Sequence, residues 1–111
     1  MYLWPRTQPE RVVSGSIVCS SGAQITGVWV APEYEWLNPG HWADRQMLNG
    51  KTYYASTVTT MRYVLHIGCG GTTQQWKLST STGFVTKDRN NFECQDGTND
   101  PRFGSCLLLS Q

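Results

Sequence analysis

Several aromatic residues gather in one stretch of the chain, and they carry its clearest potential for binding chemistry. Aromatic side chains clustered on a loop can stack against sugars or anchor a protein partner. They can equally fold back as a small satellite core. The stretch 33–51 shows no clear strand, and long loops of this kind are often functional. The predicted binding site consists of Tyr34, Trp36, Leu37, His41, Trp42 and Trp76.

Catalytic chemistry is not predicted. His41 and Asp44 could be combined with a serine into a hydrolytic triad, but no segment resembles a nucleophile elbow or an oxyanion loop. His66 has no second histidine in phase on its strand, which indicates a hydrogen-bonded side chain and not a ligand. The acidic and amide residues near 96–100 are ordinary turn formers without an EF-hand pattern. We therefore predict a non-enzyme with no cofactor and no metal.

Charge and hydropathy exclude two classes of partner. The net charge is +1 and only 15% of residues are charged, so the chain lacks the basic surface that nucleic acids or anionic membranes require. No apolar run approaches the length of a transmembrane helix, so we expect no membrane insertion by this domain.

The four cysteines indicate disulfides. Cys19, Cys69, Cys94 and Cys106 are too far apart for a zinc knuckle. An even number of widely spaced cysteines in a small chain is typical of two disulfides formed in an oxidising compartment, so a secreted or extracytoplasmic location is predicted. Three pairings are possible, and the sequence does not choose between them. We favour Cys19–Cys69 with Cys94–Cys106, because each pair falls on strand-like segments that can lie side by side.

The apolar pattern predicts strands throughout. In 63–69 apolar residues alternate with others, which is typical of a strand with one face in a core, and a Gly-Gly break follows. Similar patterns predict about seven or eight short antiparallel strands and one domain over 12–111, after an extended lead-in at 1–11. The predicted strands cover 12–20, 24–31, 51–57, 59–69, 74–80, 83–86, 92–94 and 103–109.

The long stretch 33–51 carries turn signals instead of a strand pattern. Pro39 and its neighbours predict a turn at 38–40, and Asn49-Gly50 is a strong hairpin signal. A single helical turn at 43–48 fits the remaining residues.

The cysteine and tryptophan spacing favours an immunoglobulin-like β-sandwich. Cys19 on an early strand, Trp29 soon after and Cys69 on a later strand follow the immunoglobulin order. The tyrosine expected two residues before the second cysteine is replaced by Ile67. The predicted fold is therefore an all-β, immunoglobulin-like sandwich with two disulfides.

Two resemblances bear on function. Segments 26–30 (TGVWV), 63–72 (YVLHIGCGGT) with Trp76, 90–96 (NNFECQD) and 102–106 (RFGSC) resemble an uncharacterised family of small cysteine-containing domains of actinobacteria such as Streptomyces. That resemblance implies an extracytoplasmic, disulfide-linked β domain and no particular activity. Gln74-Gln75-Trp76 resembles the Gln-x-Trp repeat of ricin-type β-trefoil lectins, but a trefoil needs three such repeats and the chain has one.

The functional prediction combines these points. We expect a secreted, non-catalytic module that binds a protein partner through the aromatic loop and could belong to a larger extracellular assembly. The alternative is a carbohydrate-binding module that uses Tyr34, Trp36 and Trp42 to bind a cell-surface glycan.

Overall fold

The fold is built from strands. The structure, a computed structural model, describes residues 9–34, 36–97 and 102–109. In these ranges the chain forms nine β-strands and no helix. The strands are β1 (Arg11–Cys19), β2 (Ile25–Pro32), β3 (His41–Trp42), β4 (Asp44–Leu48), β5 (Lys51–Val58), β6 (Tyr63–Gly71), β7 (Trp76–Val85), β8 (Asn91–Gln95) and β9 (Phe103–Leu109). Most of the predicted lead-in, residues 1–8, lies outside the described residues.

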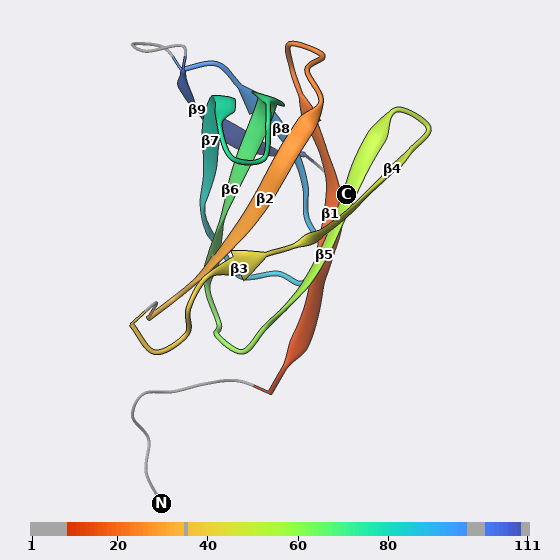
Figure 1. The fold of residues 1–111 in the computed structure, drawn as a ribbon. Coiled ribbons are helices and arrows are strands. Elements are labelled where there is room, and N and C mark those ends of the chain that lie inside the picture. The colour runs from red at the N-terminus through yellow and green to blue at the C-terminus, as the bar shows by residue number, and fades with distance from the viewer. Residues whose placement is uncertain (1–8, 35, 98–101, 110–111) are drawn as a thin grey trace, which may run out of the picture.

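All nine strands belong to one sheet that curves into a nearly closed barrel. Their order is β3-β2-β6-β7-β9-β8-β1-β5-β4, so β3 and β4 are at its two ends. These end strands are joined by a single residue, Ala43, whose N–H donates to the Val28 carbonyl at 2.9 Å. The Arg45 guanidinium reaches back from β4 to the Ile25 carbonyl at 2.8 Å. The segment 41–48 therefore connects β2 to β5 and closes this side of the barrel (Figure 1).

The all-β class and the presence of two disulfides are confirmed, but the immunoglobulin-like sandwich is not. The strands form one continuous sheet instead of two packed sheets. They are not all antiparallel either, because β1 pairs with β8 and β7 pairs with β9 in parallel. This arrangement is compatible with the same cysteine and tryptophan spacing. The pattern of apolar residues determines which face of a strand points inward, but it does not determine which strand edges pair.

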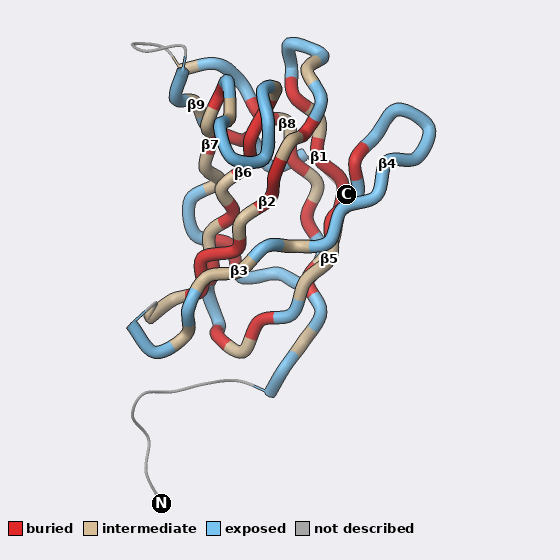
Figure 2. Tube along the Cα trace, viewed as in Figure 1, coloured by how far each residue is buried: buried red, intermediate tan, exposed pale blue. Residues whose placement is uncertain are grey.

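The segment predicted as a loop with a helical turn at 43–48 is instead extended. β4 pairs with β5 along its whole length. The turn between them contains Asn49 and Gly50 with φ of 52° and 80°, the two positive angles that a tight hairpin turn of this type requires. The hairpin signal is therefore confirmed and the helical turn is wrong. Every residue of β4 is exposed, so no alternation of apolar residues marked it as a strand (Figure 2).

The core lies inside the barrel. The alternation predicted for β6 is confirmed, because Tyr63, Leu65, Ile67 and Cys69 are all at most 1% exposed. The pairing favoured for the cysteines is also confirmed: Cys19 is bonded to Cys69, and Cys94 to Cys106. The first disulfide joins β1 to β6, which are not neighbours in the sheet, and the second joins the paired strands β8 and β9.

A buried polar network fills one end of the barrel. The Asn90 side chain is 1% exposed and donates to the Lys87 carbonyl at 2.9 Å and to the Tyr63 hydroxyl at 3.2 Å. The Tyr54 hydroxyl donates to the Asn90 carbonyl at 3.0 Å. Arg11 completes the network by donating to the carbonyls of residues 60, 61 and 86 at 2.8–2.9 Å. These bonds hold the segment 86–91 across the end of the core.

The buried phenols of this network are expected to make the fold sensitive to alkali. Burial raises the pKa of Tyr54 and of Tyr63 above the ordinary value of 10.0. A raised pKa in the folded state means that the stabilising contribution is fully present below pH ~10 and is lost as the pH rises further. Each pH unit above that value lowers the free energy of unfolding by up to about 1.4 kcal/mol for each phenol that stays protonated in the folded state.

Ultraviolet titration of the tyrosines measures this effect. We expect Tyr54 and Tyr63 to ionise only together with unfolding, because burial raises the pKa of both. A Tyr54→Phe variant should lose one of the delayed ionisations. Ionisation of Tyr54 or Tyr63 near the ordinary pKa, in protein that remains folded, would contradict the burial argument.

Candidate functional site

Main-chain hydrogen bonds join several of the described residues in the loop between β2 and β3. The N–H groups of Leu37 and Asn38 both donate to the Tyr34 carbonyl at 2.8 Å. The Asn38 side-chain amide also donates to the Glu33 carbonyl at 3.3 Å. Tyr34 has φ of 62°, a conformation that side chains other than glycine rarely adopt. Such conformations persist only where the surrounding contacts enforce them, so the conformation at Tyr34 is fixed by these hydrogen bonds.

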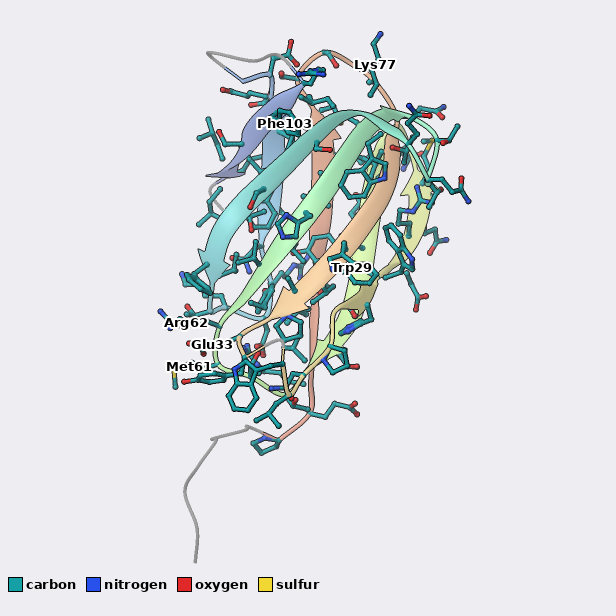
Figure 3. The ribbon with its side chains drawn as sticks, turned by 60° about the vertical axis from the view of Figure 1, so that its left-hand side comes forward. Trp29, Glu33, Met61, Arg62, Lys77 and Phe103 are labelled. Atoms are coloured by element: carbon teal, nitrogen blue, oxygen red, sulfur yellow. A yellow bond between two sulfur atoms is a disulfide. The ribbon has the colours of Figure 1, made fainter. Side chains whose placement is uncertain are left out.

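The ordered loop presents apolar side chains to solvent. Trp36 is 70% exposed and Leu37 is 44% exposed. The Trp36 ring meets the Tyr34 ring edge-on, with 6.4 Å between centroids and 80° between planes. The loop is also attached to the turn before β6, where the Glu33 N–H donates to the Arg62 carbonyl at 3.0 Å and the two side chains form an ion pair (Figure 3).

Exposed apolar side chains continue beyond the loop. The Arg62 guanidinium that pairs with Glu33 also lies over the Phe84 ring, 4.4 Å from its centroid. Phe84 is 62% exposed, and Met61 beside Arg62 is 59% exposed. This end of the barrel therefore combines large exposed apolar groups with the Arg62–Glu33 ion pair, a composition typical of surfaces that bind proteins.

A second aromatic group lies on the outer face of the barrel. Trp29 and Trp42 are opposite each other on β2 and β3, with 5.0 Å between ring centroids and 82° between planes. Trp76 approaches Trp42 at 6.2 Å and 63°. Trp42 is half exposed, whereas Trp29 and Trp76 are partly covered. We call these three residues the tryptophan cluster; Figure 3 shows Trp29 on the outside of β2.

Glycines provide the surface on which the tryptophan cluster lies. A Cβ atom at Gly68 would lie 2.3 Å from the Trp76 ring, and one at Gly27 would lie 2.8 Å from it. Gly40 is related to Trp29 in the same way, at 2.5 Å. The indoles therefore rest directly on main chain that any larger residue would cover.

His41, a residue of the predicted binding site, contacts a serine. Its Nε2 lies 2.8 Å from the Ser56 Oγ, which brings together two members of a hydrolytic triad. The neighbouring hollow of about 390 Å³ is lined by residues of β4 and its surroundings, and by neither His41 nor Ser56. A substrate carbonyl in that hollow would not meet the dyad. The contact joins β3 to β5, and this is the role that its position supports.

The structure thus divides the predicted site by its contacts. Tyr34, Trp36 and Leu37 share the ordered loop, Trp42 and Trp76 belong to the tryptophan cluster, and His41 contacts Ser56. The predicted site did not include Trp29, although strand alternation places its side chain on the face opposite to Val28 and Val30, which the structure shows to be buried.

Comparison with known proteins gives no relative from which a function could be transferred. A scan of protein-family models and searches of curated proteins and of solved structures found nothing similar to this chain. The described ranges contain no group of three His, Cys, Asp or Glu side chains placed to hold a metal ion. They also contain no helix long and apolar enough to cross a membrane.

Proposed function

We propose that the chain is a secreted, non-catalytic module that binds a protein partner through the loop of residues 33–40. The observation that carries this proposal is Trp36, a tryptophan that is 70% exposed and lies next to the hydrogen bonds from Leu37 and Asn38 to the Tyr34 carbonyl. Tryptophan is among the residues most enriched at the energetic centre of protein interfaces. A preformed loop loses little conformational entropy on binding, which favours affinity.

Ring geometry favours a protein over a sugar at this loop. A sugar chain lies flat against aromatic faces, so two rings serve it best when they share a plane. The rings of Tyr34 and Trp36 are 80° apart, which leaves one accessible indole instead of a flat platform. The neighbouring exposed Met61 and Phe84 add apolar area of the kind that a protein partner covers.

The two disulfides support the extracytoplasmic part of the proposal. All four cysteines are paired, and the structure contains no free thiol. Disulfides of this kind form and persist outside reducing compartments. The resemblance to extracytoplasmic actinobacterial domains points in the same direction.

Glycan binding is the second candidate, and it belongs to the tryptophan cluster. Trp42 is half exposed and its ring is fixed edge-on against Trp29. A rigid, exposed indole face on the outside of a sheet offers one stacking surface for a sugar ring. This candidate is separable from the first, because it requires Trp42 and not Trp36.

Substitution of Trp36 by alanine tests both candidates. Immobilised protein is titrated with a fractionated set of secreted proteins and, separately, with soluble cell-wall polysaccharide. We expect a protein ligand whose affinity falls about 30-fold in Trp36→Ala, the effect of losing the roughly 2 kcal/mol of an interface hot spot. Stability should change by less than about 0.5 kcal/mol, because the side chain is exposed.

Phe103→Ala provides the matched control, since Phe103 is another exposed aromatic residue, on β9. It should leave the affinity unchanged. Polysaccharide binding that is lost in Trp42→Ala and kept in Trp36→Ala would replace the protein-binding proposal with the glycan one. Equal losses in Trp36→Ala and Phe103→Ala would show that the loop has no special role.

A further inference from the structure

The barrel wall is open between β7 and β9. These parallel strands pair only through residues 79–81 and 103–105. Both strands then continue, β7 to Val85 and β9 to Leu109. Over 82–85 and 106–109 each strand has a partner on its far side, β6 or β8, and in the described chain no strand pairs with the sides that face each other. We call this gap the open seam.

The open seam is an apolar groove that reaches the core. It has a volume of about 190 Å³ and is lined by β7 on one side and by β8 and β9 on the other. Leu108 shares the inward face of its strand with the buried Cys106, yet Leu108 is 57% exposed. Phe92 and Val85, which are buried core residues, form part of the lining. A side chain that normally faces a barrel interior is thus open to solvent here.

The polar groups in the lining are already satisfied or lie at one end. The Asn90 side-chain amide donates to the Lys87 carbonyl and to the Tyr63 hydroxyl, so its N–H groups are already engaged. Lys87 is the charged residue of the lining, and it lies two residues after the end of β7. A ligand that fits this groove therefore has apolar groups along its length and a negative charge near Lys87.

We propose that the open seam binds an extended segment of a partner protein as an added strand between β7 and β9. A strand edge presents unpaired N–H and C=O groups, and only extended main chain can satisfy two facing edges at once. Alternate apolar side chains of the added segment would point inward to Leu108 and Phe92. An acidic residue at the end beside Lys87 would complete the match.

Direction and length follow from the same edges. Antiparallel pairing is slightly more stable than parallel pairing, so the added strand runs antiparallel to both neighbours. Its N-terminal end then lies at Lys87, where the acidic residue belongs. The unpaired parts, 82–85 and 106–109, each accommodate four residues. The groove shares no residue with the tryptophan cluster or with the loop itself, but Phe84 belongs both to its lining and to the apolar area beside that loop.

Amide hydrogen exchange with a synthetic peptide tests the proposal. The probe is acetyl-Glu-Thr-Val-Thr-Val-Thr-amide, and its control is the same peptide with N-methyl groups on alternate residues, which removes donors from one edge. In the free protein we expect fast exchange at 84 and 108. The unmodified peptide should slow exchange there at least tenfold, whereas the N-methylated peptide should not. Slow exchange in the free protein, or equal binding of both peptides, would overturn the proposal.

Two neighbouring leucines provide matched variants. Leu108 lines the groove, whereas Leu107 has similar exposure, 50% against 57%, and points to the opposite face of β9. Leu108→Glu should weaken the peptide at least tenfold and Leu107→Glu less than twofold, with circular dichroism confirming that both fold. Equal effects would show that the groove is not the binding site. Sedimentation as a dimer with 84 and 108 protected would show that a second copy covers the seam instead, and would also overturn the proposal.

Discussion

Replacing Gly15 by alanine is expected to remove at least about 3 kcal/mol of the free energy of unfolding, a large share of what a domain of this size has. A Cβ atom at Gly15 would lie 1.6 Å from the Asn90 carbonyl oxygen and 2.6 Å from its carbon. Both atoms are main chain, so no rotation of a side chain can relieve the overlap. Either β1 or the segment around Asn90 has to move.

Movement of that segment is costly because it is bonded on several sides. The Asn90 N–H donates to the Ser14 carbonyl at 3.0 Å, and the Ser14 N–H donates to the Asp88 carbonyl at 2.8 Å. The Tyr54 hydroxyl donates to the Asn90 carbonyl itself. Each buried bond lost costs about 1 kcal/mol or more, so relief of the overlap breaks the network that closes the end of the barrel.

Gly22→Ala is the control for this substitution. Gly22 also has a positive φ, of 86°, but a Cβ atom there would have no neighbour within 4 Å. Its cost should be the backbone strain alone, about 1 kcal/mol. Urea unfolding followed by tryptophan fluorescence, with disulfides kept intact, compares the two variants. If both lose the same free energy, crowding against Asn90 is not what constrains Gly15.

The part of the fold that the sequence predicted is the part decided by local patterns. The alternation in 63–69 identified the buried face of β6, and Asn49-Gly50 identified the β4–β5 turn. β4 was not predicted as a strand, because all its side chains are exposed and its strand conformation comes from pairing with β5. The single sheet and its two parallel pairs were likewise beyond prediction, since edge pairing depends on partners far away in the chain.

The same distinction applies to the candidate sites. Turn signals and aromatic residues located the loop with Trp36 and Leu37, both of which are exposed. The place of Trp29 in the tryptophan cluster depends on its pairing with Trp42 and on the opposed glycines Gly27 and Gly68, which only the register of β2 and β6 reveals. The open seam arises because a parallel pair stops early, and no residue near it marks this in the sequence.

Removing the Cys19–Cys69 disulfide is expected to cost about 4 kcal/mol, against about 3 kcal/mol for Cys94–Cys106. The cause is the loop that each bond closes in the unfolded chain, because their sequence separations are 50 and 12 residues. Double alanine variants, Cys19→Ala/Cys69→Ala and Cys94→Ala/Cys106→Ala, are compared by urea unfolding. A larger loss for the second pair would contradict the loop-length argument.

The position of the two bonds in the sheet predicts a difference that loop length alone does not. The sheet can be divided into two groups of strands, β3-β2-β6-β7 and β9-β8-β1-β5-β4. The short ladder between β7 and β9, next to the open seam, is the strand pairing that joins them. The Cys19–Cys69 disulfide links the same two groups through the core, from β1 to β6. Without it, amides of residues 79–81 should exchange faster than those of the β8–β9 ladder, because the two groups can then separate locally while β8 and β9 stay paired. Without Cys94–Cys106, the β7–β9 amides should keep their protection. Uniform loss of protection in both variants would mean that the barrel opens as a single unit and that the seam is not its weakest joint.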